Sequence, residues 1–408
     1  MKKFFKDYDF TLIFIPLMLT AFGVMMIYSA SMVSAVVLYD VPSNYFMLRQ
    51  AMWFGLGIVA FVLTMLFPYQ KYQKLVPLMI LFTIISLVLV KLMGNATGNA
   101  SSWFEVGPIK IQPSEPAKVF LIIYLASVLS KKQAYIDRFW QAVLPPLVIT
   151  ITILALIAVQ PDIGTAGIIF AIACTVILSS GIRTKHIVLL AIIGIVFLAF
   201  AIPNMTSVER VSRFTGAYAP FEDPEDGGFH LIQSYLAIGT GGITGVGLGQ
   251  GVQKLGYLPE PHTDFIMSVI AEELGFIGVL FVLASLTIIV LRGLYVARKC
   301  KDAFGSLLAI GISSMVGIQA LINLGAISGL LPITGVPLPF ISYGGSSLLV
   351  LLASIGILNN IAKQAKLQED YTYIKQTSKN AYSDIHAGNA TQSKGGRSWV
   401  QSRKSIKS

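Results

Sequence analysis

Residues 10–38 read FTLIFIPLMLTAFGVMMIYSASMVSAVVL, an apolar run without a charged side chain. The run follows three basic residues, Lys2, Lys3 and Lys6, as the apolar core of a signal peptide would. It is far longer than the ~7–15 residues of such a core, and it exceeds the ~20 residues that a helix needs to cross a bilayer. The run therefore predicts a retained signal-anchor helix.

The whole chain has the same apolar character. Of its 408 residues, 55% are hydrophobic and 12% are charged, and the mean hydropathy is +0.73. A soluble domain carries about 25% charged residues, so this composition excludes an ordinary soluble protein and a disordered one. The segments long enough to span a membrane are 10–38, 46–67, 75–93, 115–130, 139–160, 163–181, 186–203, 265–292, 303–330 and 337–362. Backbone groups in lipid must be paired within the protein, and alternating barrel-type strands are absent from the sequence. We therefore predict an all-α integral membrane protein with ten transmembrane helices.

The basic residues predict how the chain crosses the membrane. With the N-terminus in the cytoplasm, most of the 30 Lys and Arg residues fall in inner segments, as the positive-inside rule requires. Both termini are then cytoplasmic. The net charge of +10 reflects topology and contacts with anionic membrane lipids, and no nucleic-acid partner is expected.

Two regions follow from this topology. Residues 1–362 form the ten-helix domain, with a large extracellular loop at 204–264 between helices 7 and 8. Residues 363–408 are polar and basic, and they predict a disordered cytoplasmic tail. The two cysteines and four scattered histidines offer neither a disulfide framework nor a zinc-site spacing.

Carboxylates gather where the large loop enters the eighth span, in QKLGYLPEPHTDFIMSVIAEELG (253–275). Asp264, Ser268 and Glu272 follow one another at intervals of four residues, so we expect them on one helical face. Asp264 at the outer membrane edge could meet the headgroup of a lipid-linked substrate, or it could serve as a helix cap. Glu272 and Glu273 lie deeper, where a carboxylate needs a cavity or a partner. A structural ion pair with Lys118 or Arg49 is the alternative for them.

The second outer loop offers Trp103 and then GPIKIQPSEPAK (107–118). Glu115 and Lys118 share a helix face, and Lys118 lies inside an apolar run, where it needs an anion. That anion is either a lipid phosphate or a carboxylate such as Glu115. Trp103 could stack on a sugar ring, or it could be an interfacial aromatic residue.

Three further features lie in loops. Arg210 and Arg213 suit phosphate oxygens, and the alternative is a solvated pair opposite the acidic run 222–226. The glycine-rich stretch GTGGITGVGLGQG (239–251) could present backbone N–H groups to an anion, or it could form a close-packed turn. Asp162, in QPDIGTAG, is predicted to be a turn or cap residue, with a role in a site as the less favoured alternative.

Four segments together resemble the SEDS family of bacterial membrane proteins, named for shape, elongation, division and sporulation. They are WFEVGPIKIQPSEPAK (103–118), QPDIGTA (160–166), GYLPEPHTDFIMSVIAEELG (256–275) and GLLPITGVPLPFISYGGSS (329–347). The resemblance extends over about 10–362, in order and spacing. The basic tail and the wording QKLGYLPEPHTDF favour the division branch over the elongation branch.

The resemblance implies a ten-helix fold and a peptidoglycan glycosyltransferase of the bacterial cytoplasmic membrane, acting at the division septum. Its substrate would be lipid II, a disaccharide-pentapeptide on undecaprenyl pyrophosphate, and its partners a class B penicillin-binding protein and other division proteins. The essential acidic residue of the family falls on Asp264, the loop tryptophan on Trp103, and the Glu-x-x-Lys pair on Glu115 and Lys118. We also assign His262, Ser268 and Glu272 to substrate binding.

These assignments predict a mechanism. Asp264 is the general base for a sugar hydroxyl, and Lys118, Arg210 and Arg213 are candidates to bind the leaving pyrophosphate. No cofactor is required, although a divalent cation, Mg²⁺ or Mn²⁺, could bridge Asp264 and phosphate oxygens. The rival classes are a lipid II flippase and a noncatalytic scaffold. The clustering of candidate charges in the outer half favours the enzyme.

Overall fold

The computed structural model describes residues 7–93, 95–97, 100–106, 109–133, 139–160, 162–182, 188, 192, 194, 196, 216–222, 224 and 228–402. It divides into two compact units, one of which is Tyr8–Ala362 and contains the helical bundle. The predicted seventh span, 186–203, falls almost entirely outside the described residues, as do Arg210 and Arg213.

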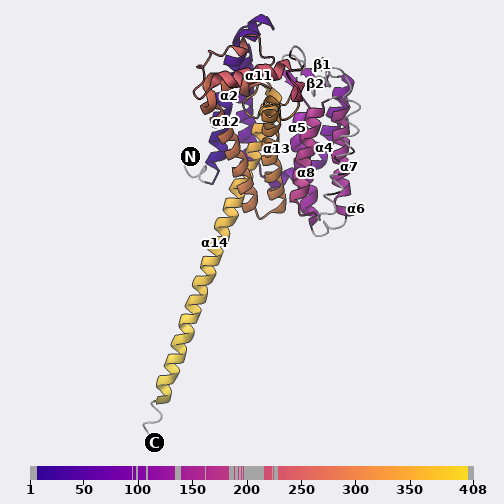
Figure 1. The fold of residues 1–408 in the computed structure, drawn as a ribbon. Coiled ribbons are helices and arrows are strands. Elements are labelled where there is room, and N and C mark those ends of the chain that lie inside the picture. Colours follow the sequence, from indigo (N-terminus) through magenta and orange to yellow (C-terminus); the bar gives the residue numbers. More distant parts are fainter. Residues whose placement is uncertain are drawn as a thin grey trace. The chain divides into compact units, whose positions relative to one another are not determined.

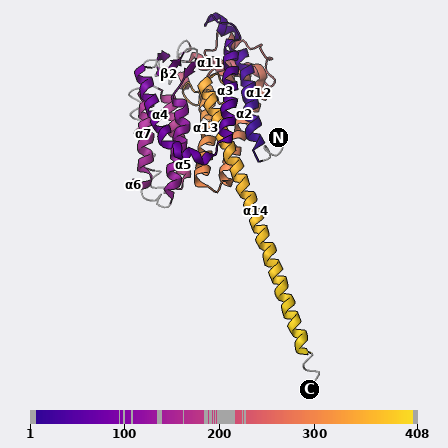
Figure 2. The ribbon, with the colours of Figure 1, turned by 180° about the vertical axis from the view of Figure 1, so that it is seen from behind.

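Helices make up most of the described chain (Figures 1 and 2). They are α2 (Phe10–Val37), α3 (Tyr45–Leu66), α4 (Tyr72–Met93), α5 (Ser114–Lys131), α6 (Phe139–Ala142), α7 (Leu144–Ala158), α8 (Ile163–Ser179), α11 (Phe229–Gly241), α12 (Ile266–Lys299), α13 (Ala303–Ile327) and α14 (Gly345–Ser402), with short 3-10 turns η1 (Tyr69–Lys71) and η4 (Gln253–Leu255). Every predicted span except the seventh contains one of these helices. The last one begins at Gly345 rather than at 337, because the proline-containing segment before it has no regular secondary structure and ends in turns.

Six of the described helices are long and apolar enough to cross a membrane: α2, α3, α4 with its η1 turn, α12, α13 and the start of α14. The helices α7 and α8 are apolar but shorter. The helix α5 carries Glu115, Lys118 and Lys131, yet most of its surface is buried. The fold is therefore a multi-pass helical membrane fold, whose total of ten spans stays a prediction.

The helix α13 lies between α12 and the pair α5 and α8 (Figure 1), and most of its residues are buried. It packs against α12 on one side and against α5 and α8 on the other. The helix α12 in turn packs against α2, and α4 packs against α5. Polar side chains on α13 and α5 are therefore held inside the protein rather than in lipid.

One end of the bundle carries a small antiparallel sheet and α11 (Figures 1 and 2). The sheet has three strands, β1 (Asn95–Thr97), β2 (Ala100–Val106) and β3 (Ile109–Ile111), in the order β1-β2-β3. Its register pairs Asn95 with Trp103 and Phe104 with Ile111. The sequence predicts a loop here instead of strands. Strands this short carry little periodicity, and their signal is hidden by the stronger apolar signal of the neighbouring spans.

The helix α12 is broken at Gly275, whose φ of 63° is closed to most side chains. The glycine-rich stretch packs against the backbone freed by the break. Phe276 donates its N–H to the carbonyl of Gly242 over 2.9 Å, and Val246 donates to the carbonyl of Glu272 over 3.0 Å. A Cβ on Gly245 would lie 2.1 Å from the carbonyl oxygen of Glu273, so only glycine fits. Residues 239–251 thus form the close-packed turn.

The helix α14 runs from Gly345 to Ser402, beyond the last predicted span. The disordered cytoplasmic tail at 363–408 stays a prediction.

Candidate functional site

A cavity of about 490 Å³ opens among α5, the β2–β3 hairpin, the start of α12 and the segment 335–347. Its lining combines both signs of charge with amides, hydroxyls and two indoles, those of Trp53 and Trp103. The residues that can carry chemistry are Arg49, Trp103, Lys110, Gln112, Glu115, Lys118, Asp162, Glu260, Asp264 and Gln319. The structure thus brings together four predicted site residues, Trp103, Glu115, Lys118 and Asp264, from distant parts of the chain.

The other predicted site residues lie elsewhere. His262, Ser268 and Glu272 do not line this cavity, and Arg210 and Arg213 lie outside the described residues. The hydroxyl of Ser268 bonds to that of Ser234 in α11 over 2.7 Å, which fixes α11 against α12. Their assignment to substrate binding stays a prediction.

Asp264 lies two residues before α12 and is half-buried. The N-cap position belongs to Phe265, whose side chain makes no capping bond. Because the helix begins at Ile266, the predicted common helical face holds for Ser268 and Glu272 but is wrong for Asp264. The carboxylate lines the cavity instead.

Asn323 of α13 fixes the backbone of Asp264. Its Nδ2 group donates to the carbonyl of Asp264 over 2.9 Å and to the carbonyl of Val336 over 2.8 Å. Asn323 is buried, with 2% of its surface exposed. One amide therefore joins three segments of the cavity wall, and sequence patterns gave no signal for it.

Glu115 and Lys118 form an ion pair, with 2.9 Å between Oε1 and Nζ. Both are buried, at 4% and 2% exposure, and the position of Glu115 in the first turn of α5 complements the helix dipole. The carboxylate alternative for the partner of Lys118 is thus present in the structure. The second oxygen, Glu115 Oε2, has no hydrogen-bond partner among the described residues.

Arg49 and Lys110 add positive charge to the cavity wall. Arg49 comes from α3, where its guanidinium lies 4.8 Å from the centroid of the Tyr45 ring, and Lys110 comes from β3. Sequence reasoning named Arg49 only as an ion-pair partner, because nothing local shows that the hairpin and α3 meet at one site. With Lys118, three cationic side chains line the cavity.

Asp162 also lines the cavity and caps α8. Its carboxylate accepts from the backbone N–H of Thr165 over 3.1 Å and from Gln112 Nε2 over 3.0 Å. Burial raises the pKa of the Asp162 carboxyl, and the bonds from Thr165 and the charge of Lys118 oppose this rise. Asp162 is therefore the cap residue that the sequence predicted, and it also lines the cavity.

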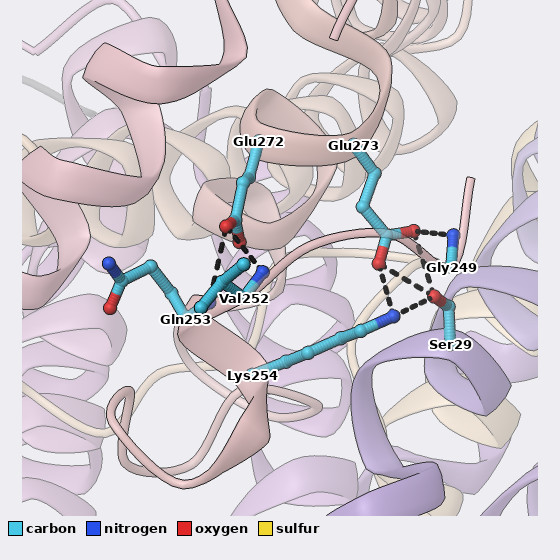
Figure 3. A network of polar contacts seen from close by, with 7 residues as sticks. All are labelled: Ser29, Gly249, Val252, Gln253, Lys254, Glu272 and Glu273. Atoms are coloured by element: carbon cyan, nitrogen blue, oxygen red, sulfur yellow. Dashed lines mark hydrogen bonds and ion pairs between the residues drawn. The ribbon is translucent and has the colours of Figure 1, made fainter. Parts of the chain in front are cut away.

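Glu272 and Glu273 face a different region, the loop that contains Lys254 (Figure 3). Glu273 pairs with Lys254 over 2.5 Å and accepts from Ser29 over 2.8 Å and from the N–H of Gly249 over 3.0 Å. Glu272 accepts from the N–H groups of Val252 and Gln253 over 2.7 and 3.1 Å. Glu273 thus has the structural ion pair that was the alternative, but its partner is Lys254 rather than Lys118 or Arg49.

His262 packs in an aromatic cluster outside the cavity. Its ring centroid lies 4.4 Å from that of Phe46 and 5.6 Å from that of Tyr343, and 2% of the residue is exposed. Burial lowers the pKa of His262, while the charge of Glu260 opposes that shift. The backbone carbonyl of His262 accepts from Tyr343, which ties the Asp264 segment to the approach to α14.

The chain belongs to the FtsW/RodA/SpoVE family of cell cycle proteins, whose sequence profile matches residues 10–367. This confirms the resemblance seen in the motifs. A probable peptidoglycan glycosyltransferase FtsW of Bacillus subtilis (strain 168) is 50% identical over 382 residues, which cover 91% of this chain and 94% of that protein. Stage V sporulation protein E of the same organism is 40% identical over 361 residues, covering 88% and 98% of the two chains.

Solved structures share the fold. One aligned chain comes from a structure described as "Structural coordination of polymerization and crosslinking by a peptidoglycan synthase complex". It aligns with a TM-score of 0.70 at 28% identity, covering 88% of this chain and 98% of that one. The rod shape determining protein RodA of Thermus thermophilus aligns with a TM-score of 0.65 at 28% identity, covering 87% and 96%.

Proposed function

We propose that this protein is a peptidoglycan glycosyltransferase that polymerises lipid II into glycan strands during septal cell-wall synthesis. The observation that carries the proposal is one cavity whose lining includes the carboxylate of Asp264 together with three cationic residues, Arg49, Lys110 and Lys118. A glycosyl transfer from a lipid pyrophosphate needs both a base and positive charge. The family membership and the 50% identity to a probable peptidoglycan glycosyltransferase support the same activity.

In the reaction, the 4-hydroxyl of one sugar attacks the anomeric carbon of another. The new carbon–oxygen bond forms while the bond to undecaprenyl pyrophosphate breaks, and the configuration inverts. Asp264 accepts the hydroxyl proton, and the pyrophosphate leaves with the bonding electron pair. No covalent enzyme intermediate is needed, because direct displacement at an α-linked donor gives the β-linked polymer.

The leaving group acquires negative charge, which Lys118, Arg49 and Lys110 stabilise from the cavity wall. Guanidinium suits the bidentate geometry of phosphate oxygens, and lysine supplies a point charge. Lys118 is already paired with Glu115, so the pair orients Lys118 before the substrate binds. Arg210 and Arg213 remain predicted additional contacts.

A divalent cation stays a subsidiary proposal. No group of three or more His, Cys, Asp or Glu side chains in the described part of the chain could hold a metal ion. The residues therefore do not fit a cation site built by the protein alone, and the step above does not pass through one. Mg²⁺ or Mn²⁺ would have to bind through the substrate phosphates with Asp264. Turnover that is unchanged in strong chelator would reject this.

The cellular setting is proposed from the same membership. We infer ten spans with both termini in the cytoplasm, the site at the outer face, and assembly at the septum with a class B penicillin-binding protein and other division proteins. The structural similarity to a chain of a peptidoglycan synthase complex supports the proposed assembly with a penicillin-binding protein. Depletion that gives filaments would support division, and depletion that gives round cells would support elongation instead.

The test uses purified protein with its cognate penicillin-binding protein, whose transpeptidase serine is inactivated, and labelled lipid II. Glycan ladders on a gel are the readout, and Asp264→Asn keeps the shape of the side chain while removing the base. Ladders that vanish in the variant are expected. Wild-type ladders from Asp264→Asn would reject the base assignment. No ladders from an intact wild-type complex would favour the flippase class, which a lipid II flipping assay would then examine.

A further inference from the structure

Gln319 of α13 carries a buried amide without a partner among the residues that the structure describes. It is 1% exposed, its Oε1 atom receives no hydrogen bond, and the side chain lines the cavity. Native proteins pair nearly all buried polar groups, so an unpaired one calls for a cause. A ligand in the cavity would supply the missing partner.

Another buried glutamine shows the ordinary arrangement. Gln50 of α3 donates from Nε2 to the carbonyl of Ser342 over 3.2 Å, and its Oε1 accepts from the N–H of Gly344 over 3.3 Å. It is 0% exposed. Both ends of the Gln50 amide are thus bonded within the protein, whereas the Oε1 atom of Gln319 has no hydrogen-bond partner among the described residues.

Gln319 lines the same cavity as the proposed base, Asp264. It precedes Asn323 by four residues on α13, so the two side chains share a helix face, and Asn323 donates to the carbonyl of Asp264. One turn of helix, about 5–6 Å, therefore separates Gln319 from the residue that fixes Asp264. A sugar whose hydroxyl reaches Asp264 would place its other ring substituents within reach of Gln319.

The chemistry of the unpaired atoms selects the part of the substrate. A pyrophosphate offers only acceptors, so it cannot satisfy Gln319 Oε1. An acetamido group offers an N–H donor beside a carbonyl acceptor, which matches the acceptor and donor of a glutamine amide. The 2-acetamido group and the 4-hydroxyl of the attacking sugar lie two ring carbons apart, a separation comparable to one helical turn.

We propose that Gln319 is a specificity-determining residue that binds the 2-acetamido group of the sugar presenting its 4-hydroxyl to Asp264. The protein thereby selects N-acetylated over N-deacetylated substrate. This inference rests on the proposed polymerase function, and it adds a contact for the sugar that is separate from the pyrophosphate contacts.

The experiment compares intact lipid II with lipid II whose terminal sugar has been N-deacetylated to the free amine. We expect the wild-type complex to polymerise intact lipid II with a kcat/KM at least about tenfold higher, since a site built to bond a polar group rejects an analogue that lacks it. Gln319→Met, which removes the amide at similar volume, should bring this ratio close to one. Gln50→Met, the matched loss of a paired buried amide, should leave the ratio at its wild-type value.

Folding acts alike on both kcat/KM values of one variant, and the charge of the free amine acts alike in every variant. The change in the ratio between wild type and Gln319→Met therefore reports recognition of the acetamido group. If Gln319→Met does not fold, Gln319→Glu serves instead, and it should shift preference toward the amine substrate. A ratio that is the same in wild type and in the folded Gln319 variant would overturn the proposal, as would a wild-type ratio near one. Failure of the wild type to make any glycan would instead reject the polymerase function itself.

Discussion

Replacing Lys254 with methionine should destabilise the protein strongly, because it leaves the Glu273 carboxylate without its cation in a buried region. Lys254 is 1% exposed and Glu273 is 0% exposed, and their charged atoms are 2.5 Å apart. Removing one member of a buried ion pair costs about 3–5 kcal/mol. Ser29 and the N–H of Gly249 still donate to Glu273 after the change. Because such bonds to a charge are each worth about 1.5–3 kcal/mol, we expect a loss near the lower limit, about 3 kcal/mol.

The assay is equilibrium unfolding in mild detergent with an added denaturing detergent, measured for wild type, Lys254→Met, Glu273→Gln and the double variant. Each single change leaves one buried group unsatisfied, while the double change removes both charges. The double variant should therefore lose less free energy of unfolding than the sum of the single variants.

The control is Arg292→Gln, which breaks the ion pair with Asp9. The Arg292 side chain is 41% exposed, so solvent screens that pair and the expected loss is below about 1 kcal/mol. Additive single changes, or a Lys254→Met variant no less stable than Arg292→Gln, would refute the reasoning that burial makes the Lys254–Glu273 pair costly to break.

Two further predictions concern the segment around Asp264. Asn323→Asp removes the donors to the carbonyls of Asp264 and Val336 and should lower the kcat of polymerisation at least about tenfold, or about 1.4 kcal/mol. Asn360→Asp, which removes an equally buried donor to the carbonyl of Met65, should lower thermal stability but keep kcat in the folded protein. Equal kcat losses in the two variants would contradict a positioning role. Burial lowers the pKa of His262, so at mildly acidic pH the unfolded chain binds a proton that the folded chain does not. The free energy of unfolding should therefore be highest above the unfolded pKa of about 6.5. It should fall as the pH drops toward the folded pKa. Thermal unfolding at pH 7.5 and 5.0 should show a smaller pH effect in His262→Gln than in wild type, and an identical effect would count against this.

The membrane spans could be predicted because their signal is local. An uncharged run such as 10–38 is driven out of water whatever the rest of the chain does. The helix α2 accordingly occupies that run almost to its ends. The charged helix α5 was also predicted, since its proline-marked start and apolar remainder are equally local. What a single sequence does not encode is which helix ends meet. Arg49 and Lys110 therefore joined the site only in the structure.

The two glutamates of α12 show the limit of reasoning from residue type. Intramembrane carboxylates usually indicate a functional cavity, and Glu272 sits in one of the specific motifs of the family. The structure supplies backbone donors from Val252 and Gln253 to Glu272. These donors are available because the break at Gly275 lets the glycine-rich turn approach α12, and no periodicity in the sequence reports such a break.

We propose that this packing lets the two glutamates help to place Asp264. The two ends of the segment from Lys254 to Glu273 are joined by polar contacts (Figure 3). Lys254 binds Glu273, and the N–H groups of Val252 and Gln253 bind Glu272. Asp264 lies midway along this closed segment, where Asn323 binds its carbonyl. A base that must meet a sugar hydroxyl within hydrogen-bond distance benefits from such fixation, because small displacements cost large factors in rate. On this proposal, variants of Glu272 would lower polymerisation through the position of Asp264, in addition to any loss of the predicted substrate contact.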